Sequence, residues 1–211
     1  MMTTETHLMK PVRVWDLPTR VGHWLLACTF FLSYLTGDSE EWRLVHAIAG
    51  FALAGILVFR AYWGFAGTRY ARFRSFLFAP RIALAYLRGL LKHNSARWIG
   101  HNPVGSYAIH ALLLLGVVVA ASGIAIWFNF DDDWVEEIHE LSSSVMLAVV
   151  GMHVVGVIVS SVLHRENLIR SMINGRKAGL PGDGIDSNRA YGLLLLFAAM
   201  VGGVALAFLP A

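Results

Sequence analysis

The sequence predicts an all-α integral membrane protein, and two observations carry this prediction. The 211-residue chain is 56% hydrophobic and only 15% charged, whereas soluble domains are typically about 45–50% apolar and about 25% charged. Its apolar residues also gather in five stretches, each long enough or nearly long enough to cross a hydrocarbon core of about 30 Å as a helix. These stretches are residues 21–36, 44–66, 104–128, 138–163 and 190–209.

The first stretch is the shortest, and residues 15–19 before it are expected in the membrane interface. It lacks a convincing small-residue cleavage site ahead of Asp38, so we expect a retained helix and not a cleaved signal peptide. The fifth stretch is expected to add a C-terminal transmembrane helix to the first four, after a flexible connection with the sequence "LPGDGIDSN".

The loops between the stretches differ in charge. From Arg60 to His101 there are eight Lys and Arg residues and no Asp or Glu, whereas the first and third loops read "GDSEEW" and "NFDDDWVEE". Basic loops stay in the cytoplasm, which places the N-terminus inside and the C-terminus outside. Residues 79–92, "APRIALAYLRGLLK", mix leucines with arginines and are expected to form an interfacial cytoplasmic helix.

The net charge of +3 and the single cysteine bear on which partners and which kinds of cysteine site the chain can have. Because the basic residues fall at the ends of apolar stretches, they indicate a membrane lipid surface as the partner and not nucleic acid. One cysteine, Cys28, excludes an internal disulfide framework and a cysteine metal cluster.

Four histidines lie in or beside the apolar stretches at matched depths. His139 and His153 share one stretch, fourteen residues apart, which is about 21 Å and nearly four whole helical turns, so they share a face. His23 follows the cytoplasmic start of the first stretch, and His46 follows the outer start of the second. In antiparallel helices, His23 therefore falls at the depth of His153, and His46 at the depth of His139.

Paired histidines at membrane depth indicate a metal cofactor. Ionisable groups there are costly and usually face the bundle interior with a partner, and neutral imidazole is a good axial ligand for haem iron. We therefore predict a four-helix transmembrane bundle that holds two non-covalent b-type haems, each between two histidines. A bare zinc site is less favoured, because the two depths divide the ligands into twos. The glycines expected to leave room for the macrocycles are Gly22, Gly50, Gly151 and Gly156.

The remaining histidines have other expected roles. His110 lies near the depth of His23 and is an alternative inner ligand. His101, in "GHNPVG", is placed for a haem propionate, a quinone or a simple turn. His7, His93 and His164 are expected in solvent.

Two arginines are candidates for contact with the inner haem. Arg20 precedes His23 by three residues and Arg60 follows His46 by fourteen, so both fall at the inner depth. We expect at least one of them to meet a haem propionate, because arginine matches carboxylate geometry. Ordinary anchoring at the membrane surface is the alternative.

The motifs "RVWDLPTRVGHWLL", "LVHAIAGFALAGILVFRAYWGF", "GHNPVGSYAIHALLLL" and "EEIHELSSSVMLAVVGMHVVGVIVSSVLHRE" resemble the bacterial cytochrome b561 family. This broad family includes the cytochrome b subunits of nickel–iron hydrogenases. The resemblance covers roughly residues 12–179 and implies that four helices hold two b haems. It pairs His23 with His153 and His46 with His139, and it leaves the fifth stretch outside the family core.

The resemblance implies electron transfer across the bacterial inner membrane, between quinone and a periplasmic partner such as a c-type cytochrome. A membrane-anchor subunit of a hydrogenase or another periplasmic oxidoreductase is an alternative, and a haem-free transporter that relays protons through histidines is a more distant one. Whether the protein is an enzyme or an electron carrier stays open at this point, as does a homodimer. The expected domains are a haem domain at residues 1–179 and a linker with the fifth helix at 180–211.

Overall fold

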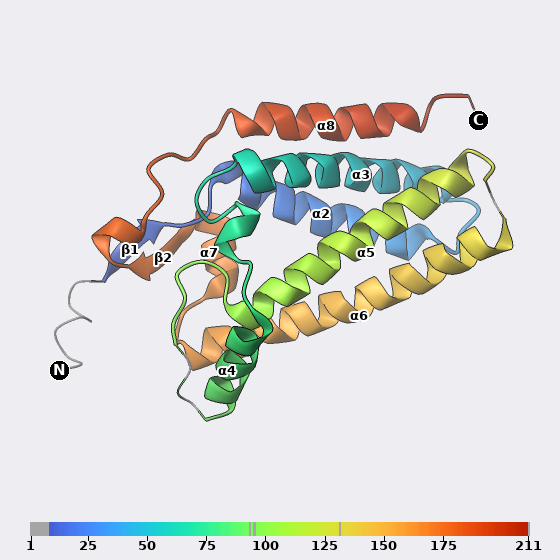
Figure 1. The fold of residues 1–211 in the computed structure, drawn as a ribbon. Coiled ribbons are helices and arrows are strands. Elements are labelled where there is room, and N and C mark those ends of the chain that lie inside the picture. The colour runs from blue at the N-terminus through green and yellow to red at the C-terminus, as the bar shows by residue number, and fades with distance from the viewer. Residues whose placement is uncertain (1–8, 93, 95, 131, 211) are drawn as a thin grey trace. The chain divides into compact units, whose positions relative to one another are not determined.

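The structure is a computed structural model that describes residues 9–92, 94, 96–130 and 132–210. Helices dominate it, as Figure 1 shows. In chain order its elements are β1 (Lys10–Arg13), α2 (Leu17–Thr36), α3 (Arg43–Ala66), η1 (Phe73–Ser75), α4 (Pro80–Leu91), α5 (Pro103–Trp127), α6 (Asp133–Leu163), α7 (Leu168–Asn174), β2 (Arg176–Gly179), η2 (Pro181–Asp183) and α8 (Gly192–Leu206).

Three helical segments in the described part of the chain are long and apolar enough to cross a membrane. They are Glu40–Ala66, which contains α3, then Pro103–Trp127 and Asp133–Leu163. Each exceeds the roughly 20 residues that a bilayer needs. The helix α2 (Leu17–Thr36) has 20 residues but is not among these three segments, so its crossing stays a prediction.

The fifth apolar stretch forms a shorter helix than expected. We expected residues 190–209, whereas α8 has 15 residues and therefore a length of about 22 Å. Beyond Leu206 the backbone tightens, since Ala207, Phe208 and Leu209 each donate to the carbonyl three residues earlier. The helix expected over residues 79–92 is present with close to its expected bounds, because α4 covers Pro80–Leu91; its place in the membrane interface stays a prediction.

The chain divides into two compact units, which are described separately. The loop unit comprises Met1–Arg20, Trp63–Ile109 and Met152–Ala190, and the helix unit comprises Val21–Tyr62, His110–Gly151 and Tyr191–Ala211.

Within the helix unit, apolar side chains and small residues pack the helices together. One buried cluster contains Phe30, Leu53, Leu57 and Met146, and a second contains Ala47, Phe51 and Ala207. Glycines bring α3 and α8 into backbone contact: a Cβ added at Gly55 would collide with the Ala199 carbonyl, and one added at Gly203 with the Phe51 carbonyl. Small residues at such contacts are typical of helix packing in membranes.

Within the loop unit, β1 and β2 form a two-stranded antiparallel sheet that pairs Lys10 with Gly179 and Arg13 with Arg176. The all-α prediction omitted this sheet. Its four-residue strands are rich in basic residues and lack the alternating polarity that marks a strand in a sequence. The connection expected to be flexible is also ordered, because the Tyr70 hydroxyl donates to the Asp183 carbonyl at 2.7 Å.

A fully buried carboxylate joins the start of α2 to the end of α3 in the loop unit. Asp16 caps α2 by accepting from the Thr19 amide at 2.8 Å. It also accepts from the Trp63 indole at 3.1 Å and from the Thr68 hydroxyl at 2.6 Å. These donors satisfy a charge that would be costly to bury alone.

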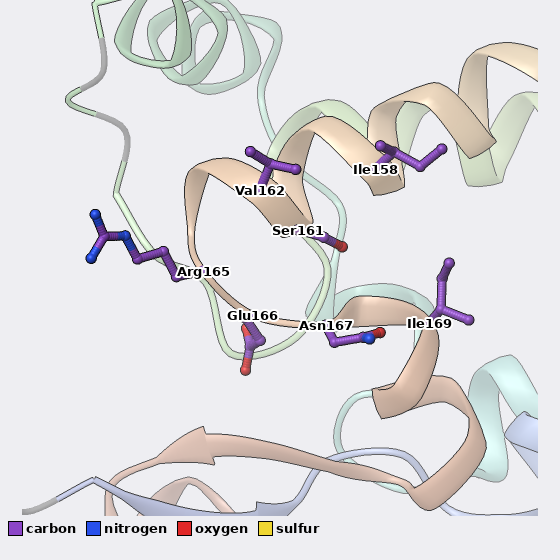
Figure 2. Close-up of a pocket in the computed structure, with 7 residues that line it drawn as sticks. All are labelled: Ile158, Ser161, Val162, Arg165, Glu166, Asn167 and Ile169. Atoms are coloured by element: carbon purple, nitrogen blue, oxygen red, sulfur yellow. The ribbon is translucent and has the colours of Figure 1, made fainter.

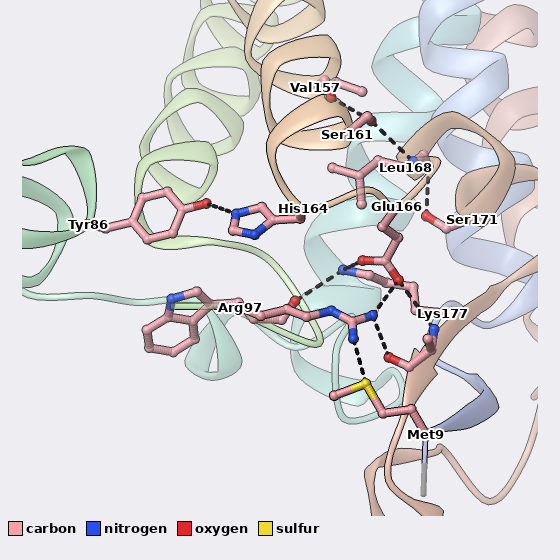
Figure 3. Close-up of polar contacts among 12 residues, drawn as sticks. Met9, Tyr86, Arg97, Val157, Ser161, His164, Glu166, Leu168, Ser171 and Lys177 are labelled. Carbon is pink, nitrogen blue, oxygen red and sulfur yellow. Dashed lines mark hydrogen bonds and ion pairs between the residues drawn. The ribbon is translucent and has the colours of Figure 1, made fainter. Parts of the chain in front are cut away.

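A second polar cluster, drawn in Figure 3, ties the sheet to the turn after α6. Glu166 forms two ion pairs: its Oε1 lies 3.0 Å from Arg97 Nη2, and its Oε2 lies 3.4 Å from Lys177 Nζ. Lys177 is buried and also donates to the Trp98 carbonyl at 3.1 Å. Burial lowers the pKa of Lys177, while the neighbouring Glu166 carboxylate opposes that shift.

Candidate functional site

The helix unit brings two histidines face to edge. His46 in α3 and His139 in α6 have ring centroids 6.1 Å apart and ring planes inclined by 71°. Both side chains are half-buried. A metal–imidazole bond is about 2 Å long, so two rings at this separation are near enough for one metal ion to bond both.

The backbone fixes the tautomer of His46. Its Nδ1 lies 2.9 Å from the Ser33 carbonyl oxygen in α2. Because a carbonyl only accepts, Nδ1 carries the proton and Nε2 keeps its lone pair. The Ser33 hydroxyl in turn donates to the His46 carbonyl at 2.9 Å. The imidazole is therefore oriented as the second-shell bonds of metal-binding histidines orient their rings.

His139 is held in the same tautomer by α5. Its Nδ1 lies 3.1 Å from the Val119 carbonyl oxygen and 3.0 Å from the Ser122 hydroxyl. Ser122 is buried and donates its own proton to the Val118 carbonyl at 2.8 Å, which leaves its oxygen to accept from the imidazole. Nε2 of His139 therefore also keeps its lone pair.

A glycine sits directly against the His139 ring. A Cβ added at Gly123 would lie 2.9 Å from His139 Cε1, closer than real side chains approach. At Gly37 an added Cβ would lie 3.6 Å from His46 Cε1, an ordinary contact. Sequence reasoning singled out neither glycine, because a contact between separate helices leaves no local signal.

These residues fit the axial ligation of a haem. Two neutral imidazoles from facing helices, each with Nδ1 bonded to backbone and Nε2 able to coordinate, are the donor set that haem iron takes. Within the described residues, no three His, Cys, Asp or Glu side chains come together.

The comparison with known proteins agrees with this chemistry. A family model described as prokaryotic cytochrome b561 matches residues 14–175. The chain belongs to the prokaryotic cytochrome b561 family. Membership makes it a multi-pass membrane cytochrome and implies b-type haem and electron transfer.

Several relatives are named as probable Ni/Fe-hydrogenase B-type cytochrome subunits. The protein of Rhizobium leguminosarum bv. viciae is 25% identical over 213 residues, which cover 79% of this chain and 88% of the relative. That of Azotobacter vinelandii is 24% identical, covering 78% and 87%. The Ni/Fe-hydrogenase 1 subunit of Escherichia coli K12 is 28% identical over 142 residues, covering 54% and 59%. No solved structure matches the chain.

The other two expected ligands of this cytochrome lie in different units. His23, in the helix unit, is half-buried and meets the Trp24 ring edge-on at 5.1 Å. His153, in the loop unit, is half-buried in α6. Their pairing therefore stays a prediction. Neither Gly151 nor Gly156 would place a Cβ within 4 Å of another group, so space is open beside the helix that carries His153.

The competing histidines occupy distinct surroundings. His110 is half-buried in α5. His101 contacts two rings of the loop unit, with centroid distances of 4.7 Å to Trp15 and 4.4 Å to Phe76. His164 was expected in solvent, but it is half-buried and its Nε2 lies 3.1 Å from the Tyr86 hydroxyl. His7 and His93 fall outside the described residues.

The two candidate arginines lie in different surroundings. Arg20 donates a hydrogen bond from Nη1 to the Ile173 carbonyl near the end of α7. One nitrogen of its guanidinium is therefore already hydrogen-bonded within the loop unit. Arg60 is half-buried in α3. Contact of either side chain with a haem propionate stays a prediction.

A shallow pocket lies elsewhere, where α6 meets α7 (Figure 2). It is lined by the apolar residues Ile158, Val162 and Ile169 and by the polar residues Ser161, Arg165, Glu166 and Asn167. No histidine lines it, so it is not the site of haem ligation.

Proposed function

We propose that this cytochrome transfers electrons across the bacterial inner membrane through two b haems, between membrane quinone and a periplasmic redox partner. The pairing of His46 with His139, with both Nδ1 atoms bonded to backbone carbonyls, carries the proposal. When bound, haem iron supplies the one-electron redox chemistry. Quinone as the membrane substrate follows from the family resemblance.

The proposed ligand sets follow the depths of the histidines. His46 and His139 hold the outer haem, while His23 and His153 hold the inner one. The second pair is supported by helix rise and by the family resemblance. We further propose that Arg20 or Arg60 meets an inner propionate, because both residues fall at that depth.

The chain's own groups set the properties of the outer site. The carbonyls of Ser33 and Val119 hold the Nδ1 protons, which raises the basicity of each Nε2 and fixes each ring. The same unit also contains the buried apolar cluster of Phe30, Leu53, Leu57 and Met146. A dry, low-dielectric surrounding is one of the levers that tune a haem potential.

The proposed arrangement places the haem domain at residues 1–179 and a linker with the fifth transmembrane helix at 180–211. The N-terminus lies in the cytoplasm and the C-terminus in the periplasm, because basic loops remain inside. A homodimer is compatible with this arrangement.

A membrane-anchor role is the second candidate, and the named relatives favour it. Several of them are probable Ni/Fe-hydrogenase subunits, so the redox partner of this chain is then a hydrogenase or a similar periplasmic oxidoreductase.

The acidic residues Glu40, Glu41, Asp132, Asp133, Glu136 and Glu137 are exposed in the helix unit. They offer a surface for a basic partner such as a c-type cytochrome.

A haem count tests the proposal directly. The purified protein should show b-type absorption bands that change on reduction, and a pyridine haemochrome assay should approach two haems per chain. A value near one in fully loaded protein contradicts the two-pair scheme. Absence of any haem band supports the histidine-relay transporter instead.

A further inference from the structure

The helix α4 divides its surface into three stripes of different chemistry. Its packed stripe contains Ala83, Tyr86 and Leu90, spaced three and four residues apart and therefore on one face. Tyr86 is 7% exposed, and its hydroxyl lies 3.1 Å from Nε2 of His164, the residue after α6 (Figure 3). This contact fixes which side of α4 faces the rest of the loop unit.

A second stripe is apolar and open. Leu84, Leu87 and Leu91 follow one another at intervals of three and four residues, and they are 48%, 42% and 75% exposed. We call them the leucine stripe. Leu77, shortly before the helix, is also 66% exposed. An open apolar patch of this kind marks a contact surface for a membrane or a partner.

The third stripe is basic and adjoins the leucine stripe. Arg81, Arg88 and Lys92 are spaced seven and four residues apart and are all exposed. We call them the cationic stripe. The whole segment from Arg60 to His101 has no Asp or Glu, so no carboxylate of that segment neutralises these charges.

We propose that α4 is an anionic-phospholipid binding helix of this membrane cytochrome. The leucine stripe lies among acyl chains, and the cationic stripe binds lipid phosphates. Adjacent apolar and basic stripes suit a helix that lies in the membrane interface, and the positive charge selects anionic headgroups over zwitterionic ones. The Tyr86–His164 contact turns both stripes away from the rest of the loop unit. This inference requires no haem and is independent of the proposed electron transfer.

Lipid titration of the full-length protein tests the cationic stripe. Native mass spectrometry with phosphatidylglycerol should show roughly hundredfold weaker binding for the triple variant R81Q/R88Q/K92Q, because each interfacial cation contributes substantially. The matched control R165Q/R170Q/R176Q removes three other exposed charges and should bind like wild type. Phosphatidylcholine should bind all three proteins alike. Equal phosphatidylglycerol binding by the two triple variants overturns the proposal.

Spin labels test the depth of the leucine stripe. The background is Cys28→Ala, which removes the chain's only cysteine, an exposed one. A label at Leu87→Cys in phosphatidylglycerol nanodiscs should be more accessible to oxygen than to a water-soluble nickel chelate. A label at Ala85→Cys, four residues after Arg81 and three before Arg88, should show the opposite. Nickel access that is equally high at both positions contradicts insertion of α4.

Discussion

Ser33 and His46 join α2 to α3 through two reciprocal hydrogen bonds. The Ser33 hydroxyl donates to the His46 carbonyl at 2.9 Å, and His46 Nδ1 donates to the Ser33 carbonyl at 2.9 Å. The bond that orients the imidazole therefore uses the backbone of residue 33 and not its side chain. The haem ligation proposed for His46 would therefore depend on the packing of α2 against α3, and it should tolerate loss of the Ser33 hydroxyl better than a shift of either helix.

The first prediction concerns ligand replacement. His46→Ala and His139→Ala should give the same spectrum, in which one haem is lost or becomes high-spin and the other is intact. Each change removes one axial ligand from the outer pair and leaves the inner pair untouched. Low-temperature absorption and electron paramagnetic resonance spectra of the reduced and oxidised proteins measure this.

The inner pair supplies the control. His23→Ala and His153→Ala should share a spectrum that is complementary to the first. A match between His46→Ala and His153→Ala would show that the pairing is crossed. Loss of a haem in His110→Ala but not in His23→Ala would make α5 a ligand helix.

The second prediction concerns the glycine beside His139. Gly123→Ala should disturb the outer haem selectively, because the new Cβ would lie 2.9 Å from His139 Cε1 and the ring must move. We expect a shifted midpoint potential or partial haem loss in a redox titration. Gly202→Ala is the matched control, since a Cβ there meets nothing within 4 Å. Identical titrations for the two variants would show that the ring adapts freely.

The third prediction concerns the buried carboxylate. Asp16→Ala should lower the stability of the folded protein by roughly 2–4 kcal/mol, because it removes the cap of α2 and leaves the Trp63 and Thr68 donors buried without their acceptor. Thermal unfolding in detergent measures the loss. Asp186→Ala, at an exposed position, should unfold like wild type. An unchanged midpoint for Asp16→Ala would mean that water replaces the carboxylate.

The fourth prediction concerns pH. Burial lowers the pKa of His164, and the charges of Lys177 and Arg97 lower it further, against the opposing effect of Glu166. The unfolded chain, with a histidine pKa of about 6.5, then binds more protons than the folded chain as the pH falls below that value. The stability that neutral His164 contributes to the folded protein at neutral pH is therefore lost as the pH falls below about 6.5.

The variant His164→Gln isolates this contribution. Glutamine does not titrate and can still accept a hydrogen bond from Tyr86. Its unfolding temperature should fall less than that of wild type between about pH 7 and about pH 5. The same fall in both proteins would assign the acid sensitivity to other groups.

Local patterns predicted much of this fold. The amphipathic segment at residues 79–92 became α4 at Pro80–Leu91, because stripes at helical spacing are visible in one short window. The spacing of His46 and His139 within their apolar stretches anticipated that the two would lie together. Their role as iron ligands stays a prediction.

The features that the sequence did not predict depend on distant partners. Asp16 meets Trp63 and Thr68, which lie 47 and 52 residues further along the chain. His164 looked solvated until the fold placed Tyr86, 78 residues away, against it. The β1–β2 sheet likewise pairs the two short segments that lie directly before and directly after the family-matched region. Each contact is set by tertiary packing, which no local window contains.

The glycine contact between α3 and α8 also bears on how the protein is made. Gly55 and Gly203 let the two backbones touch, yet nearly 150 residues separate them in the chain. When α3 leaves the ribosome, the surface that α8 will cover is still bare, and it stays bare until α5 and α6 have been synthesised. During that interval a membrane insertase or the lipid itself must shield the surface of α3 around Gly55. Mispairing of α3 with another helix before α8 has been synthesised would therefore use this surface.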